Sequence, residues 1–262
     1  MGQTIACANQ KGGVGKTTTV VNVAAYLAAD GARVLVVDLD PQGNATSGFG
    51  AARAPAGRSV YDALVGDVPL GDLRVATGTE GLDLVPSSIA LAGAEVELAD
   101  VPQRERRLAR ILPEVAAEYD VAFVDCPPSL GLLTVNALTA ADSVLVPLQC
   151  EYYALEGLSQ LLATIHLVRD HLNPRLAVNG IVLTMFDART NLAAEVAAEA
   201  RRHLDGAVYD TIVPRSVRLA EAPSHGRPIA QYAPDSRGAA AYRALARELS
   251  ARTAAAPIGG VA

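Results

Sequence analysis

The chain has 262 residues, half of them hydrophobic, and its 22 basic and 28 acidic side chains give a formal net charge of −6. This length suits one large α/β domain, and the acidic balance argues against a protein that coats nucleic acid with its whole surface. No apolar run approaches the roughly 18 residues that cross a bilayer, and the first predicted strand begins too early to leave room for a signal peptide. We therefore expect a cytoplasmic protein.

Hydrophobic runs of strand length alternate along the chain with longer segments of helical period. This alternation is typical of a doubly wound α/β fold, a mostly parallel sheet with helices on both faces. The predicted strands span residues 4–8, 33–38, 82–86, 121–125, 143–147, 177–184 and 208–213. The predicted helices span residues 17–30, 59–65, 89–99, 103–119, 131–140, 151–171, 191–204, 217–222 and 236–252.

Two segments fall outside this alternation. Residues 43–81 are rich in glycine, alanine and short turns, and we expect a partly irregular excursion there. Residues 254–262 contain proline and glycine but no charge, which predicts a flexible tail after a single domain spanning residues 1–253. Charge also varies along the chain, because residues 1–168 carry a net −9 and residues 169–262 a net +3. Contacts with a polyanion are therefore expected in the last third.

The first predicted strand is followed by a glycine-rich stretch, Lys11-Gly12-Gly13-Val14-Gly15-Lys16-Thr17-Thr18. Glycines let successive backbone N–H groups turn inward, and the N-terminus of the next helix attracts anions. We interpret the stretch as a phosphate-binding loop in which Lys16 neutralises the β- and γ-phosphates and the Thr17 hydroxyl completes an Mg²⁺ shell. The usual pattern G-x-x-x-x-G-K-[ST] is broken, because Gln10 stands where its first glycine is expected. The loop has a second lysine, Lys11, in addition to Lys16 of the pattern, and these two are the chain's only lysines.

Aspartates lie at the ends of two predicted strands. Asp38 and Asp40 alternate onto one side, so both carboxylates are expected to face the phosphate loop, one holding a metal-bound water and the other positioning the attacking water. Taken alone, the pair could equally solubilise a strand end. Asp125 ends a second apolar strand in the Walker-B arrangement, which orients Mg²⁺ beside phosphates. The order of loop, aspartate pair and single aspartate predicts a nucleotide site with Asp38 and Asp125 near the metal.

The phosphate loop resembles the deviant Walker A motif of the ParA/MinD group, with Lys11 as its signature lysine. Further stretches are similar to the chromosomal ParA (Soj) branch of this group. They are residues 38–44, 125–131, 146–151, 184–187 and 221–226. The resemblance covers about residues 3 to 250.

The resemblance implies a weak ATPase that uses ATP and Mg²⁺ and dimerises with ATP held between its subunits. Lys11 would reach the partner's phosphates, and together with Lys16 and a water positioned by Asp40 it would form the catalytic group. Asp125 would support the metal. Gly12 would lie where a side chain obstructs the subunit interface. Because the ATP dimer would be the active species, the nucleotide would act as a switch.

The resemblance also implies partners and further contacts. Met185, Pro214 and Arg215 correspond to the adenine pocket, although ordinary turns after strands explain Met185 equally well. Arg189 and Arg218 match positions that bind nonspecific double-stranded DNA, and the alternative for each is a solvated surface charge. Arginine pairs with phosphate in a bidentate fork that carries no sequence information. A ParB-like protein would stimulate hydrolysis, the location would be nucleoid-associated, and no membrane contact is expected.

Other functions fit the sequence less well. A MinD-like membrane ATPase needs a basic, bulky amphipathic helix, whereas the last helix is alanine-rich. An iron–sulfur reductase needs cluster cysteines, and Cys126 has no convincing second cysteine. A plasmid-type ParA would carry a helix-turn-helix domain before the first strand. A scaffold that binds nucleotide without hydrolysing it would not need Asp40 beside Lys16 and Asp125.

Overall fold

The computed structural model describes residues 2–52, 54, 57–66, 68–151, 154–204 and 206–254. Among these residues, eight strands form one sheet in the order β3-β4-β2-β5-β1-β6-β7-β8. The strands are β1 (Gln3–Cys7), β2 (Val34–Asp38), β3 (Val75–Ala76), β4 (Leu82–Val85), β5 (Val121–Asp125), β6 (Ser143–Gln149), β7 (Ala177–Phe186) and β8 (Val208–Pro214). All pairs are parallel except β3 with β4. The mostly parallel sheet and every predicted strand are confirmed, and β3 is an addition.

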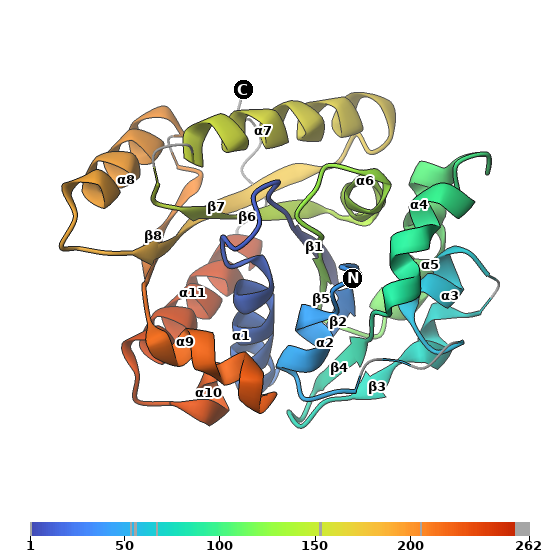
Figure 1. Ribbon diagram of the computed structural model, residues 1–262, viewed down its shortest axis with the longest axis horizontal. Helices are drawn as coiled ribbons and strands as arrows, with labels where there is room; N and C mark the ends of the chain where they lie inside the picture. Colours follow the sequence, from blue (N-terminus) through green and yellow to red (C-terminus); the bar gives the residue numbers. More distant parts are fainter. Residues whose placement is uncertain are drawn as a thin grey trace.

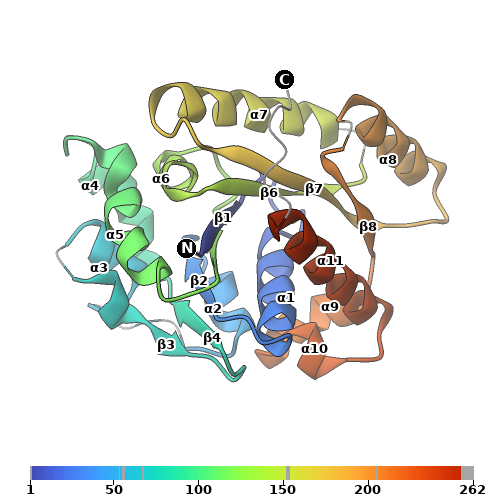
Figure 2. The ribbon, with the colours of Figure 1, turned by 180° about the vertical axis from the view of Figure 1, so that it is seen from behind.

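Helices cover both faces of the sheet, as predicted (Figures 1 and 2). The first face carries α1 (Lys16–Ala29), α2 (Asn44–Gly48), α9 (Val217–Glu221), η4 (Ala222–His225), α10 (Ile229–Tyr232) and α11 (Arg237–Ala254). The second face carries α3 (Val60–Leu64), η1 (Leu70–Leu73), η2 (Ile89–Gly93), α4 (Ala94–Glu97), η3 (Arg104–Arg106), α5 (Arg107–Ala116), α6 (Leu132–Ala140), α7 (Ala154–His171) and α8 (Asn191–His203). Here η marks a 3₁₀ helix.

Two apolar cores lie on opposite sides of the sheet because side chains alternate along each strand. In β1, Ile5 and Cys7 pack into the core under α1, whereas Ala6 packs into the core under α5 and α6. The apolar side of α11 packs on the sheet, where Tyr242 and Leu249 are buried. No helix in the described part of the chain is long and apolar enough to span a membrane.

Several helix boundaries differ from the predictions. The helix predicted over residues 103–119 begins only at Arg107, because Gln103 has a left-handed φ of 55° and a 3₁₀ turn follows it. The helix predicted over residues 89–99 is half 3₁₀ and ends at Glu97. The excursion over residues 43–81 contains the unpredicted helix α2. α11 runs to Ala254, and residues 255–262 of the predicted tail lie outside the described residues.

The two edges of the sheet are protected against pairing with a further strand in different ways. β3 is only two residues long and both are exposed. β8 is covered by α11, where Glu248 accepts hydrogen bonds from the backbone N–H groups of Asp210 (2.8 Å) and Thr211 (2.9 Å). Arg252 donates to the Val208 carbonyl (2.9 Å), and its guanidinium lies 4.0 Å from the centre of the Tyr209 ring. Charged side chains therefore occupy the backbone groups that an added strand would need.

The order of strands places the predicted site. β1 lies between β5 and β6. The chain runs from β1 to β2 on the side of β5, and after β5 it crosses to β6 on the other side of β1, so the strand order reverses at this point. A crevice opens at such a switch point beyond the carboxyl ends of the strands. The loops that follow β1, β2 and β5 all emerge at this end, which brings together residues that are more than 100 positions apart.

Candidate nucleotide-binding site

The glycine-rich loop connects β1 to α1 in a conformation that needs glycine. Gly13 and Gly15 have φ angles of 74° and 92°, in the left-handed region that other residues rarely adopt. Asn9 anchors the loop, because its side-chain amide donates to the Pro147 carbonyl (2.7 Å) and its oxygen accepts from the Lys11 N–H (2.9 Å). Asn9 is not among the predicted site residues, because the sequence shows only an amide side chain after an apolar run and does not show its contact with Pro147.

The two lysines of the loop have opposite surroundings. Lys16 is only 6% exposed, and its ammonium group donates to the Lys11 carbonyl at 3.1 Å, inside the loop. The Lys11 side chain is 42% exposed and forms an ion pair with Glu151, with 2.5 Å between Nζ and Oε2. One ammonium group is thus directed into the cradle of the loop, and the other lies on the surface beside it.

Thr17 and Asp125 meet as predicted, although they come from different elements. The Thr17 hydroxyl donates to Asp125 Oδ2 at 2.7 Å. Asp125 is fully buried, and its Oδ1 has no hydrogen-bond partner within the described residues. Burial, and then the nearby charge of Asp38, raise the pKa of the Asp125 carboxyl well above its usual range. An orphaned carboxylate oxygen beside a threonine hydroxyl fits Mg²⁺ or a water bound to it.

The aspartate pair separates into two environments. Asp38 Oδ2 accepts from both the backbone N–H and the hydroxyl of Thr46, each at 2.7 Å. Burial raises the pKa of Asp38 to about 6, against these hydrogen bonds. Asp40 lines the cavity beside the loop and accepts from the Gln42 N–H at 2.9 Å. The expectation that both carboxylates face the loop therefore holds only for Asp40, because Thr46 turns Asp38 toward α2.

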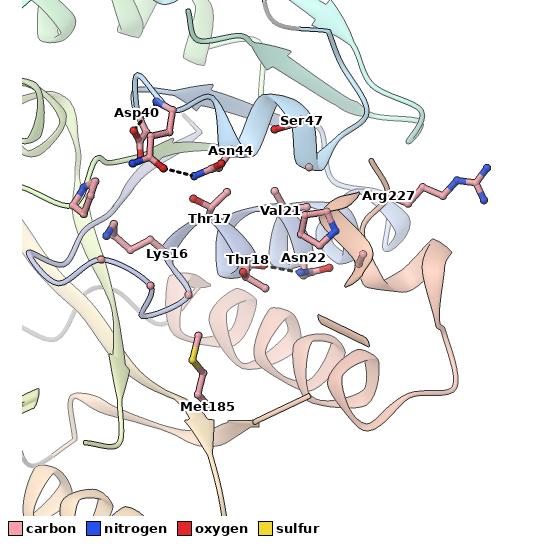
Figure 3. A pocket seen from close by; sticks show the side chains of 18 residues that line it. Lys16, Thr17, Thr18, Val21, Asn22, Asp40, Asn44, Ser47, Met185 and Arg227 are labelled. Atoms are coloured by element: carbon pink, nitrogen blue, oxygen red, sulfur yellow. Dashed lines mark hydrogen bonds between the residues drawn. The ribbon is translucent and has the colours of Figure 1, made fainter. Parts of the chain in front are cut away.

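A cavity of about 350 Å³ lies over the loop. Figure 3 shows Lys16 and Thr17 on one wall, with Asp40 and Asn44 opposite. Burial raises the pKa of the Asp40 carboxyl, opposed by the Gln42 N–H and by the positive charge of Lys16. The cavity thus combines a phosphate cradle, a candidate metal position and a carboxyl with a raised pKa. These are the groups that phosphoryl transfer to water needs.

A second cavity of about 360 Å³ adjoins the loop on the side of β8. The residues predicted for the adenine pocket, Met185, Pro214 and Arg215, all line it. Met185 also has a left-handed φ of 49°, unusual for a residue other than glycine. The remaining lining includes Val217, Leu219 and Tyr242, which had not been predicted, and most of its exposed surface is apolar. A planar base fits such a cavity.

The two arginines predicted to bind DNA follow neighbouring strands. Arg189 lies in the loop after β7 and Arg218 on α9 after β8, and the Arg215 N–H donates to the Phe186 carbonyl (3.0 Å) where these strands end. The Arg189 side chain is 87% exposed and pairs with Asp187 at 2.7 Å. The Arg218 side chain is 61% exposed and pairs with Glu221 at 2.9 Å. Both guanidinium groups are on the surface beside a carboxylate.

Comparison with known proteins agrees with this geometry. A family model described as an AAA domain matches residues 2–178. The chromosome-partitioning protein ParA of Myxococcus xanthus is 54% identical over 96% of this chain and 89% of its own length. The sporulation initiation inhibitor protein Soj of Bacillus subtilis is 58% identical over 96% of this chain and 99% of its own length. The chain belongs to the ParA/Soj family of chromosome-partitioning ATPases.

Two solved structures share the fold of this ParA/Soj family member, and one of them contains ADP and magnesium. A Mycobacterium smegmatis protein named cobyrinic acid a,c-diamide synthase, solved with ADP and magnesium, is 41% identical with a TM-score of 0.82, over 94% of this chain and 93% of its own. The cell-division ATPase MinD of Pyrococcus furiosus has a TM-score of 0.78 at 24% identity, over 96% and 99% of the two chains, and shares the fold. The predicted family and nucleotide-binding character are thereby confirmed.

Proposed function

We propose that the chain is a DNA-segregation ATPase whose ATP-bound dimer binds nonspecific DNA and is reset when a ParB-like protein stimulates hydrolysis. The names of its ParA and Soj relatives support a role in partitioning. The observation that carries the dimer is the division between the lysines. Lys16 serves its own loop, whereas Lys11 sits on the surface next to that loop, where a neighbouring subunit can reach it.

Gly12 supports the same arrangement. Its φ is not in the left-handed region, and a Cβ built there would meet only Pro128, at 3.7 Å. Neither the backbone nor a described neighbour in the subunit requires glycine at this position. A second subunit that approaches the loop would require it.

In the proposed reaction the chain positions groups rather than forming bonds. Lys16 and the loop N–H groups hold the β- and γ-phosphates, and Thr17 with Asp125 holds Mg²⁺, which supplies charge neutralisation when bound. Asp40 orients the attacking water, and its raised pKa makes it a stronger proton acceptor than an ordinary aspartate. The apolar cavity at Met185 and Pro214 receives the base.

Size-exclusion chromatography with ATP and Mg²⁺ tests this proposal. Asp40→Ala should elute as a dimer and release no phosphate, because it keeps the binding groups and loses the water-positioning carboxyl. Lys16→Ala should bind ATP poorly and remain monomeric. Lys11→Ala should bind ATP as a monomer. A monomeric Asp40→Ala variant at saturating ATP would contradict the dimer, and equal losses of ATP binding in the two lysine variants would make Lys11 an ordinary phosphate ligand.

We further propose that the protein is cytoplasmic and associates with the nucleoid. Arg189 and Arg218 are the proposed DNA contacts, and in the bound state each would exchange its carboxylate for a phosphate. Phosphate release measured with DNA and a ParB-like protein, alone and together, tests the partners. Turnover that stays at the level of Asp40→Ala under all these conditions would leave a nucleotide-binding protein without the proposed cycle.

A further inference from the structure

The ion pair of Lys11 is built from three side chains. Glu151 follows β6, and its Oε2 lies 2.5 Å from Lys11 Nζ. The amide nitrogen of Gln149, the last residue of β6, donates to the other oxygen of Glu151 at 2.5 Å. Both oxygens of the carboxylate therefore have partners. Gln149 orients Glu151, and Glu151 holds Lys11.

The backbone of Lys11 is fixed independently of this pair. Asn9 accepts the Lys11 N–H and donates to the Pro147 carbonyl, and the Lys11 carbonyl accepts from Lys16. The part of Lys11 that can move is therefore its side chain. With the two side chains 42% and 49% exposed, the pair can open into water without leaving a buried charge behind.

We infer that Glu151 is a positioning residue that holds Lys11 on its own subunit and so sets the ATP concentration at which the dimer forms. This inference rests on the proposed function, in which Lys11 reaches the partner's phosphates. A terminal phosphate carries more negative charge and more acceptor oxygens than a carboxylate, so the γ-phosphate of a partner's ATP can displace Glu151. ADP lacks that phosphate, and with ADP the pair stays closed.

The strength of an exposed ion pair determines the size of the effect. One dimer opens two such pairs, and exposed pairs are individually weak, so loss of the Glu151 charge should favour the dimer by roughly 2- to 30-fold. Glu151 therefore tunes the threshold and does not block assembly. Because the pair is exposed, salt should weaken it.

The test compares Glu151→Gln with Glu118→Gln, both in the Asp40→Ala background so that ATP is not consumed. Glu118 forms an ion pair of similar length with Arg74, at 2.6 Å, and lines neither cavity. Light scattering at fixed protein concentration gives the ATP concentration at half-dimerisation. Each dimer binds two ATP molecules, so the midpoint changes as the square root of the dimerisation constant. We expect Glu151→Gln to lower the midpoint by roughly 1.4- to 5-fold and Glu118→Gln to leave it unchanged. The difference should shrink at about 1 M salt, where charges are screened within about 3 Å.

The outcomes separate the inference from the proposed function. A parent protein that stays monomeric with ATP overturns both. A parent that dimerises while Glu151→Gln has an unchanged or raised midpoint overturns the inference alone, and a raised midpoint would mean that Glu151 presents Lys11 to the partner. Gln149→Ala provides a second route if Glu151→Gln folds poorly, because it releases the orientation of Glu151 and should lower the midpoint in the same direction.

Discussion

Asp125 belongs to the candidate site and lowers the stability of the folded protein. It is a fully buried carboxyl with an unpartnered oxygen, and its neighbours include a second buried carboxyl, Asp38. A buried acid that lacks a full set of donors weakens the folded state, because burial disfavours its charged form. Its one direct partner among the described residues is the Thr17 hydroxyl of the phosphate loop. This residue is explained by a bound cation better than by stability.

Asp125→Asn should therefore separate stability from function. The pKa of Asp125 is higher in the folded protein than in the unfolded chain. Ionisation of this carboxyl therefore destabilises the folded protein as the pH rises above the pKa of the unfolded chain. The asparagine amide cannot ionise, so the variant avoids this loss of stability at pH 7. We expect the nucleotide-free protein to become more stable to thermal or chemical unfolding, by about 1.4 kcal/mol for each unit by which the folded pKa exceeds the unfolded one, up to the pH of the measurement. Mg²⁺ affinity of the ATP complex should fall about 10- to 100-fold.

The control for this variant is Asp83→Asn, which changes a carboxyl of β4 that accepts from Tyr119 outside both cavities. It should leave Mg²⁺ affinity unchanged. An Asp125→Asn protein that binds Mg²⁺ with ATP as tightly as the wild type would remove Asp125 from the metal site.

The contact between α11 and β8 should contribute a stability that depends on pH. Burial raises the pKa of Glu248, but the N–H groups of Thr211 and Asp210 and the charge of Arg252 outweigh it, and the net shift is downward. The folded pKa thus lies below the unfolded one, so the stabilisation is present above the unfolded value of about 4.3 and is lost as the pH falls through the folded value.

Glu248→Gln should cost about 1–3 kcal/mol at pH 7, because the amide replaces two charged acceptor oxygens by one neutral oxygen and an NH₂ group that cannot accept from the second backbone N–H. The cost should decrease as the pH falls below about 4.3 and should disappear once the pH is below the lowered pKa of the folded wild-type carboxyl. Urea unfolding at pH 7 and pH 3.5, with Glu195→Gln on the exposed side of α8 as the matched variant, measures it. A destabilisation of equal size at both pH values would assign the effect to packing rather than charge.

The strands could be predicted from sequence because their apolar runs are local signals, and α2 could not. Apart from Ala45, its residues, Asn44–Gly48, are poor helix formers and include glycine. What holds the helix is tertiary, since Thr46 donates twice to Asp38 and its hydroxyl accepts from the Ser87 N–H (3.1 Å). The start of α5 was misplaced for a related reason, because the left-handed φ of Gln103 is a feature of local geometry that periodicity does not reveal.

Some residues of the candidate site could likewise be predicted from the sequence, and others could not. The loop, Asp40 and Asp125 were identified because residue type and position after a strand are enough to indicate phosphate and metal chemistry. Asn9 and Glu151 were not, because their roles arise from contacts across strands, in which the end of β6 lies beside the loop after β1. A single sequence contains the residues of such contacts but not the strand order that creates them.

The proposed binding to DNA would have to overcome the net charge of −6 that the whole molecule carries. The proposed contacts, Arg189 and Arg218, lie in the last third of the chain, where the net charge is positive. Alanine at either position should weaken DNA binding by the ATP dimer. It should also reduce the slope of log K against log[salt] by roughly 0.9 for each DNA phosphate that the variant no longer neutralises. Dimerisation with ATP should be unaffected.

Arg33→Ala is the matched control, since Arg33 forms a comparable surface ion pair with Asp120 (3.0 Å) in the acidic part of the chain. Its slope should equal that of the wild type in fluorescence anisotropy titrations with duplex DNA. If Arg189→Ala or Arg218→Ala prevents dimerisation, that arginine is an interface residue. An unchanged slope would remove it from the DNA surface.

The protected edges of the sheet also restrict how copies of the chain can associate. Exposed strand edges act as templates for strands of other chains, the route to domain-swapped and amyloid-like aggregates. Here one edge ends in the two-residue strand β3, and the other has its N–H groups bonded to Glu248 and a carbonyl bonded to Arg252. Continuation of the sheet from one molecule into the next is therefore disfavoured at both ends. The proposed ATP-dependent dimer would therefore form at the surface where the strands end, without extending the sheet from one subunit into the other.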